Sequence, residues 1–286
     1  MKTPHSKTGF TIIEVALFLA LSGLLMIGLI VGANTSISRQ RYNDSVNNVG
    51  DYIRNIYADA LNVSNDKTVT PDTSTYTGPG RTTTAVYGKL VTFGAKSSSV
   101  NNTITSTIYS YDVVGRAITS AEATSQSVLN MLKTTIDASI ADTVYASGLY
   151  TNNFYRLTSY NIPWEAKAQE PNTAAGTPRS SIFSGAVLVV RSPTTGSLRT
   201  YVYSGSMANF SFHTIDDGAP SGTNVTTMFR QLLDNLHEGE LNFCVESSDN
   251  NYGNRRNIRI LERAGNSTGV LLVALDGEDS KCLGRP

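Results

Sequence analysis

The feature that most constrains this 286-residue chain is an uncharged apolar run from Val15 to Ala33, which begins directly after the carboxylate of Glu14. With residues 10–13 included, an α-helix through the run is about 36 Å long at 1.5 Å per residue, slightly more than a hydrocarbon core of about 30 Å. The run can therefore span a membrane. A carboxylate near the end of such a helix costs on the order of 2.5 to 3.5 kcal/mol on insertion scales, so Glu14 needs a partner.

Inside the apolar run no cation lies within helical reach of Glu14. The nearest fixed positive charge would be an amino terminus created by cutting the chain between Gly9 and Phe10, on the same chain or on a neighbouring one. The residues immediately before Glu14 therefore decide whether such a terminus can form.

Those residues, Lys7-Thr8-Gly9-Phe10-Thr11-Ile12-Ile13-Glu14-Val15, resemble the start of the type IV prepilin family. Members of that family carry a short basic leader that ends in Gly, followed by Phe, Thr, an aliphatic pair and Glu. The resemblance implies that residues 1–9 are a leader, that prepilin peptidase cuts between Gly9 and Phe10, and that Phe10 is then N-methylated. It also implies that Glu14 neutralises the terminal amine of an adjacent subunit during filament assembly. The resemblance covers about the first sixty residues.

The function implied by this resemblance is that of a subunit of a type IV pilus, or of a related secretion or competence filament. The large domain favours a minor pilin with a role in initiation, adhesion or surface binding. The expected partners are prepilin peptidase, other pilin subunits through the N-terminal helix, the pilus assembly platform and the cytoplasmic membrane before assembly. We expect a single-pass protein with its N-terminus inside, which reaches the extracellular pilus or cell surface after assembly.

Three other interpretations compete for the same segment. A secretory signal peptide could end at Val31-Gly32-Ala33, but its apolar core would be too long and Glu14 would be misplaced. A plain anchor would make the protein a monomeric, membrane-anchored extracytoplasmic binding or adhesion domain, with no role for Glu14. The spacing from Thr11 to Glu14 also fits a capping box, in which Glu14 reaches back to the first residue of the helix.

The helix is predicted to continue beyond the membrane, to about Leu61. From Tyr42 onward its apolar residues recur at steps of three and four, which is typical of a helix with one buried face: Val46, Val49, Ile53, Ile56 and Ala60. We therefore divide the chain into a leader (1–9), a membrane or filament-core half-helix (10–33), an amphipathic half-helix (34–62) and an extracytoplasmic β-rich domain (63–286). Gly23, Gly28 and Gly32 either weaken the first half-helix or allow close contact between helices.

The domain is predicted to have an α+β fold of the pilin type, in which the long helix packs on an antiparallel sheet. Polar segments at 65–84 and 163–178 are predicted loops. A helix is predicted for 120–147, because apolar residues repeat every four positions, and a short one for 226–236. Alternating or apolar runs predict strands at 86–93, 104–111, 154–160, 186–191, 198–204, 241–246, 257–262 and 270–275, with 186–204 as a hairpin.

Charge and composition argue against several classes of function. The chain carries 23 basic and 23 acidic residues, and only 16% of its residues are charged, so no nucleic-acid partner is indicated. Four arginines, Arg255, Arg256, Arg259 and Arg263, are interpreted as a solvated strand face, with Ile258 and Ile260 facing inward.

Catalytic and metal-binding signals are equally weak. His213, with Asp216 and Asp217, lacks a nucleophile signature, so we expect no enzymatic activity and no cofactor. The Asp249 segment resembles the start of a calcium loop but lacks the acidic residue at the twelfth position, so it is predicted to be a polar turn without metal.

Cys244 and Cys282 are the only cysteines, and without CxxC spacing they make a poor metal site. They can pair if the domain is extracytoplasmic, which would contribute about 4 kcal/mol in the chain-entropy model. The alternative is two unpaired buried thiols in a cytoplasmic protein. Prepilins often close their last strands with a disulfide, so the resemblance favours the pair.

Overall fold

The structure is a computed structural model. It divides into two compact units, Met1–Asp44 and Ser45–Pro286, and the helix α1 contributes residues to both. The parts of the chain that it describes are residues 11–62, 84–97, 104–116, 129–130, 132, 145–146, 158–171, 181–192, 195–207, 231–247, 255–273 and 282.

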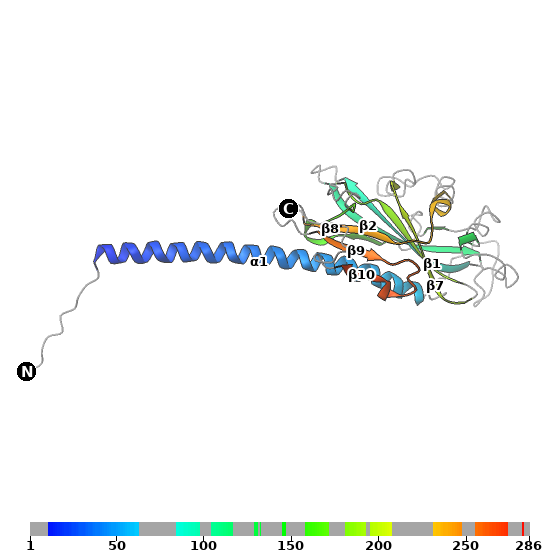
Figure 1. The fold of residues 1–286 in the computed structure, drawn as a ribbon, viewed down its shortest axis with the longest axis horizontal. Coiled ribbons are helices and arrows are strands. Elements are labelled where there is room, and N and C mark those ends of the chain that lie inside the picture. The colour runs from blue at the N-terminus through cyan, green and yellow to red at the C-terminus, as the bar shows by residue number, and fades with distance from the viewer. Residues whose placement is uncertain are drawn as a thin grey trace, which may run out of the picture. The chain divides into compact units, whose positions relative to one another are not determined.

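Helix α1 (Ile12–Leu61) is continuous over 50 residues and ends where the sequence predicts (Figure 1). Gly23, Gly28 and Gly32 do not break it, and a Cβ added at any of these three positions would meet nothing within 4 Å. The glycines are therefore not required by packing inside the chain. The predicted start at Phe10 falls outside the described residues.

Within the second unit, the last part of α1 buries one face, as its periodicity predicts. Val46, Val49, Ile53, Ile56 and Ala60 are all buried. The helix approaches β10 (Val270–Val273) so closely that a Cβ at Gly50 would lie 3.0 Å from a methyl group of Leu272. Nearby, Arg54 Nη2 donates a hydrogen bond of 3.1 Å to the carbonyl of Val270. Apolar burial and this polar contact together hold the helix beside the strand.

The larger sheet, called sheet A here, has strand order β3-β2-β1-β6-β7, with β4 also paired to β2, and every pairing is antiparallel. The predicted hairpin is confirmed as β6 and β7. The strands of sheet A are β1 (Thr84–Ser97), β2 (Ile104–Arg116), β3 (Tyr145–Ala146), β4 (Thr158–Asn161), β6 (Gly185–Arg191) and β7 (Leu198–Ser204).

The smaller sheet, sheet B, has the order β10-β9-β8-β5 and is also antiparallel. It contains β5 (Lys167–Gln169), β8 (Leu241–Glu246), β9 (Arg256–Ile260) and β10. The predicted C-terminal meander is thus confirmed, although β9 ends at Ile260 rather than Glu262. The two sheets and the helix give the α+β class that the sequence predicts.

Sheet A is covered on both faces. One face carries a hydrophobic core to which Leu132 and the helical segment 231–235 contribute; its buried members include Leu90, Tyr109, Tyr111, Leu188, Tyr201, Leu232 and Leu233. On the opposite face, the ring of Phe93 contacts two other rings. Its centroid lies 5.2 Å from that of Phe183, which is two residues before β6, and 4.9 Å from that of Phe243 in β8. This aromatic trio joins the two sheets, since rings at such distances make favourable edge and offset contacts.

A β-bulge in β1 decides which side chains reach each face. The pairing of β1 with β2 shifts register between Val86 and Gly88. As a result Tyr87 and Leu90, three residues apart, both belong to the hydrophobic core, whereas an unbroken strand would point them to opposite faces. Gly88 lies so close to β6 that an added Cβ would meet the carbonyl oxygen of Val189 at 1.9 Å. Only glycine fits there, and Lys89 is directed to the face opposite the core.

Several predictions for the irregular segments were wrong. The helix predicted for 120–147 does not extend to its end, because Tyr145–Ala146 pairs with β2 as strand β3. The loop predicted for 163–178 contains a 3₁₀ turn, Pro163–Glu165, and strand β5. A three-residue strand is too short to be recognised from alternation, and its pairing with β8 makes it a strand.

Other predictions are covered by the described residues only in part. The strand predicted for 154–160 is described only as Thr158–Asn161. Most of the predicted loop 65–84 lies outside the described residues.

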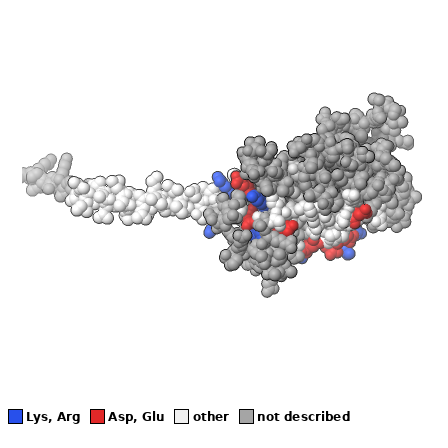
Figure 2. All heavy atoms as spheres, turned by 90° about the horizontal axis from the view of Figure 1, so that it is seen from above, with Lys and Arg blue, Asp and Glu red and all other residues white. Residues whose placement is uncertain are grey.

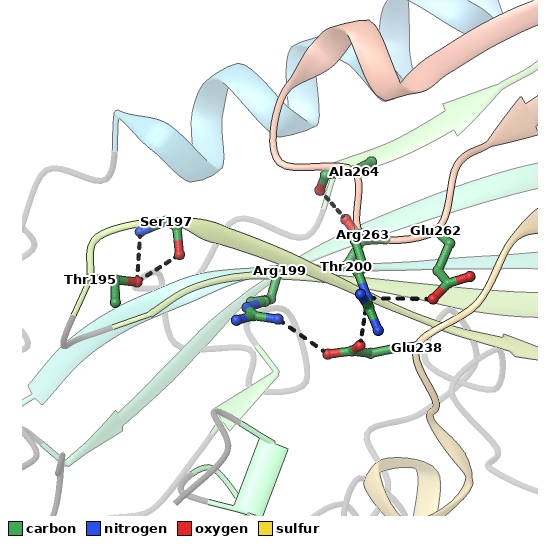
Figure 3. A network of polar contacts seen from close by, with 8 residues as sticks. All are labelled: Thr195, Ser197, Arg199, Thr200, Glu238, Glu262, Arg263 and Ala264. Carbon is green, nitrogen blue, oxygen red and sulfur yellow. Dashed lines mark hydrogen bonds and ion pairs between the residues drawn. The ribbon is translucent and has the colours of Figure 1, made fainter.

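A buried chain of hydroxyl groups connects α1 to β7. Thr200 Oγ1 donates a hydrogen bond of 2.7 Å to the carbonyl of Ala264 (Figure 3). Its oxygen therefore accepts at 2.9 Å from the hydroxyl of Tyr57. Tyr57 is fully buried. Burial raises the pKa of Tyr57 from 10.0 to about 12, and the hydrogen bond to Thr200 acts in the opposite direction. The phenol is therefore held in its neutral form.

We expect the Tyr57 hydroxyl to make the protein sensitive to alkali. In the unfolded chain a tyrosine loses its proton near pH 10, and folded Tyr57 keeps it to about pH 12, so stability is unaffected below pH 10 and falls between these values. The loss is on the order of 2 to 3 kcal/mol. Denaturant unfolding from about pH 9 to about pH 12 should show a shallower decline for Tyr57→Phe than for the wild type.

Thr200→Val is the matched control for this measurement. It removes the hydrogen-bond partner but leaves the phenol, so stability should drop at every pH while the alkaline decline remains. An equal alkaline decline in Tyr57→Phe and the wild type would contradict the assignment.

Candidate functional site in the N-terminal helix

The first turn of α1 is closed by a reciprocal set of hydrogen bonds between Thr11 and Glu14. The backbone N–H of Thr11 donates to Glu14 Oε2 at 3.1 Å, and the Thr11 hydroxyl donates to the same oxygen at 3.2 Å. The backbone N–H of Glu14 donates to Thr11 Oγ1 at 3.3 Å. This is the capping box that the spacing predicts, and it satisfies N–H groups that a helix start otherwise leaves without partners.

The cap does not neutralise the charge of Glu14. Its partners are uncharged, and among the residues that the structure describes Glu14 has no ion pair. The helix dipole favours a negative charge in the first turn by a few tenths to about 1 kcal/mol, which offsets only part of the cost of placing it in lipid. An exposed carboxylate thus remains at the start of the helix, able to accept a cation.

Gly9 and Phe10 lie outside the described residues, so processing and methylation at these positions stay predictions. By sequence, the amine that cleavage would create is one residue before Thr11. Thr11 is the residue whose N–H and hydroxyl both point to the Glu14 carboxylate. The cap therefore orders Thr11, the residue that would follow the predicted new terminus in the sequence.

The segment after Glu14 presents its apolar side chains outward throughout. Its large apolar side chains, from Val15 to Val31, are exposed, with values such as 73% for Leu24 and 74% for Leu29. This first part of α1 is long and apolar enough to cross a membrane. Figure 2 shows it without the Lys, Arg, Asp and Glu side chains that begin farther along the helix. So large an apolar surface requires lipid or other protein to cover it.

Two hydroxyl groups, one within this segment and one just after it, are satisfied within the helix. Ser22 Oγ donates to the carbonyl of Leu19 at 3.1 Å, and Thr35 Oγ1 donates to the carbonyl of Val31 at 2.9 Å. Polar groups in hydrocarbon need internal partners, so these bonds suit a helix placed in lipid. Sequence reasoning missed them, although Ser and Thr often bond to the carbonyl three or four residues earlier.

At the other end of the chain, Cys244 and Cys282 form a disulfide with their Cα atoms 5.6 Å apart. Both cysteines are fully buried. Cys244 is on β8, between Gln169 of β5 and Asn257 of β9. The bond closes a loop with a sequence separation of 38 residues and ties Cys282 to the middle of sheet B.

The arginine cluster near the C-terminus is engaged by acidic side chains. Arg255 Nε lies 3.6 Å from a carboxylate oxygen of Glu246, and Arg259 pairs with Glu240. Glu238 lies between two arginines, 3.1 Å from Arg263 Nε and 3.4 Å from Arg199 Nη1 (Figure 3). Ile258 and Ile260 are buried, as predicted. The predicted solvated strand face is only partly right, because Arg256 and Arg259 of β9 are partly exposed whereas Arg255 is buried just before the strand.

Most residues of the other candidate sites lie outside the described part of the chain. His213, Asp216, Asp217 and the Asp249 segment lie outside the described residues. His237 is exposed, and its backbone pairs with Val202 of β7. In the described part of the chain, no group of three or more His, Cys, Asp or Glu side chains is arranged to hold a metal ion.

No protein-family model, curated protein or solved structure matches this chain.

We expect Thr11→Ala to loosen the first turn of α1. Removing an N-cap side chain costs about 0.5 to 2 kcal/mol, because the helix loses a partner for its first N–H groups. Amide hydrogen exchange in detergent should accelerate by about 2- to 30-fold at residues 12–15. Thr35→Ala, which removes a hydroxyl bond in mid-helix, should leave exchange in the first turn unchanged. Unaltered exchange in Thr11→Ala would refute the capping role.

Removing the disulfide should destabilise the domain. The double variant Cys244→Ala/Cys282→Ala is expected to lose about 4 kcal/mol of unfolding free energy, because the unfolded chain is no longer constrained by the closed loop. Denaturant titration of the full chain in detergent measures this loss. Adding a reductant should lower the midpoint of the wild type and leave that of the variant in place; a wild type indifferent to reductant would argue against the bond.

Proposed function

We propose that the protein is a subunit of a type IV pilus or a related filament, processed between Gly9 and Phe10 and assembled through α1. The observation that carries this proposal is the position of Glu14. It is a charged carboxylate at the start of an exposed apolar helix, held by Thr11 beside the segment where a new amino terminus would begin. Among the described residues Glu14 has no ion pair, and a terminal ammonium of an adjacent subunit would supply its partner.

The energetics of the helix support the proposal. Fully burying one Leu, Ile or Phe side chain is worth about 1.5 to 3 kcal/mol, so the exposed side chains from Ile12 to Val31 favour any environment that covers them. Lipid covers them before assembly, and the helices of neighbouring subunits cover them afterwards. Transfer from lipid to a helix bundle gains little from hydrophobicity itself, so a specific attraction such as that between Glu14 and an amine selects the position of the subunit.

The second unit supports an exported, display role. Its disulfide suits an oxidising compartment outside the cytoplasm. Two sheets and the buried half of α1 form a domain larger than a filament core needs, which favours a minor pilin active in initiation, adhesion or surface binding. The cytoplasmic membrane, prepilin peptidase, the assembly platform and other pilins are the partners implied.

The N-terminus of the mature protein tests the processing step. Mass spectrometry of protein isolated from its native cells should find a chain that begins at N-methylated Phe10. Protein that retains residues 1–9 would contradict the proposal and leave a monomeric membrane-anchored binding domain as the alternative.

Substitution of Glu14 tests the assembly step, because the chain allows its charge and its cap to be separated. Glutamine preserves a capping box, so Glu14→Gln removes only the charge, whereas Thr11→Ala removes the cap and keeps the charge. We expect Glu14→Gln to remain in the membrane but to lose incorporation into sheared filaments by at least about tenfold. Thr11→Ala should be affected less.

Glu165→Gln, at an exposed position of the second unit, is the matched control for a change of charge elsewhere. It should assemble as the wild type does. Normal incorporation of Glu14→Gln would overturn the role of the carboxylate.

A further inference from the structure

A lysine and an aspartate face each other in the middle of sheet A. Lys89 of β1 and Asp112 of β2 are direct cross-strand partners, and Lys89 Nζ is in contact with Asp112 Oδ1. The neighbours of Asp112 on β2, Tyr111 and Val113, point into the hydrophobic core. Asp112 therefore points to the opposite face, to which the bulge at Gly88 also directs Lys89.

This pair is unusually well buried for two charged groups. The Asp112 side chain is only 2% exposed and that of Lys89 only 18%. Taking an ion pair out of water carries a desolvation cost that its mutual attraction often fails to recover. A chain that gained only an ion pair from these residues would gain little stability from it.

A second carboxylate reaches the same amine from α1. Asp59 Oδ2 lies 3.9 Å from Lys89 Nζ, and its side chain is 65% exposed. Lys89 Nζ thus lies between a buried carboxyl group and one that is in contact with water. The exposed carboxylate is placed to accept a proton from the nitrogen and to return it during a reaction, while the buried one remains beside the nitrogen.

We propose that Lys89 and Asp112 become joined by an intramolecular isopeptide bond. The Lys89 ammonium gives one proton to the Asp112 carboxylate that it contacts, and the resulting neutral amine attacks Cγ of the Asp112 carboxyl group. As the C–N bond forms, Asp59 accepts a second proton from the nitrogen and returns it to the departing hydroxyl of Asp112, so that the C–O bond breaks and water leaves. An ammonium and a carboxylate are converted into one amide and one water molecule, with no oxidant, reductant or co-substrate.

The geometry supplies what such a condensation needs. Sheet register holds the two groups together, and well-oriented intramolecular reactions reach effective concentrations of about 10⁵ to 10⁸ M. The buried position of Asp112 limits the water that would reverse the reaction. The product has no charge, so the desolvation cost of the ion pair disappears. The bond would link adjacent strands β1 and β2 covalently, and it does not rest on the proposed function in a filament.

Peptide mapping of the full chain tests the proposal directly. After reduction and trypsin digestion of detergent-purified protein, an isopeptide prevents cleavage at Lys89. The expected product is residues 82–96 joined to residues 97–116, with the summed mass less one water. Fragmentation of this species should place the link at Lys89 and Asp112. Recovery of residues 82–89, 90–96 and 97–116 as separate, unmodified peptides would overturn the proposal.

Two variants define the roles of the residues. Lys89→Arg keeps a positive charge but cannot form the amide, so residues 97–116 should appear unlinked at full mass. Asp59→Asn changes an exposed side chain and should slow formation of the linked species on the order of a hundredfold in freshly synthesised protein. Linkage at the wild-type rate in Asp59→Asn would refute the role of Asp59, and linked peptides in Lys89→Arg would place the bond elsewhere.

Discussion

The whole structure depends on one uninterrupted helix that must satisfy two different surroundings. Between Glu14 and Arg39 helix α1 carries no charge and exposes its apolar side chains, and from Ser45 onward it buries a single face in the domain. A helix can do both because every interior N–H and C=O is already bonded within it. Its first turn leaves N–H groups without intrahelical partners, and the side chains of Thr11 and Glu14 each accept a hydrogen bond from one of the N–H groups there.

The domain holds its part of α1 by polar as well as apolar contacts. Ser45 donates to the carbonyl of Pro163, Arg54 to that of Val270, and Tyr57 to Thr200. These bonds reach three different parts of the domain. Apolar burial alone is less specific about how far the helix slides or rotates. The hydrogen bonds fix its register, because a buried donor or acceptor that loses its partner costs about 1 to 3 kcal/mol.

Periodicity revealed the long elements and failed for the short ones. The buried stripe from Val46 to Ala60 and the hairpin around Gly196 could be predicted from the sequence because many residues repeat one pattern. Strands β3 and β5 could not be predicted, because segments of two or three residues become strands only through their pairing with β2 and β8. The Thr11–Glu14 cap followed from spacing alone. The Lys89–Asp112 pair could not be predicted in this way, because it depends on a bulge and on the register between two strands, which no local sequence pattern specifies.

The cap and the charge of Glu14 are compatible rather than competing. Both hydrogen bonds that Glu14 accepts end on Oε2, and both come from neutral donors, so they lower the cost of burying the carboxylate without cancelling its charge. A carboxylate that was already paired with a lysine on its own helix would have nothing to offer a second chain. One that lacked the cap would be costlier to place in lipid and less well oriented. Within the described residues Glu14 is thus a capped acid without an ion pair, and the cap that makes it less costly in lipid leaves its charge in place.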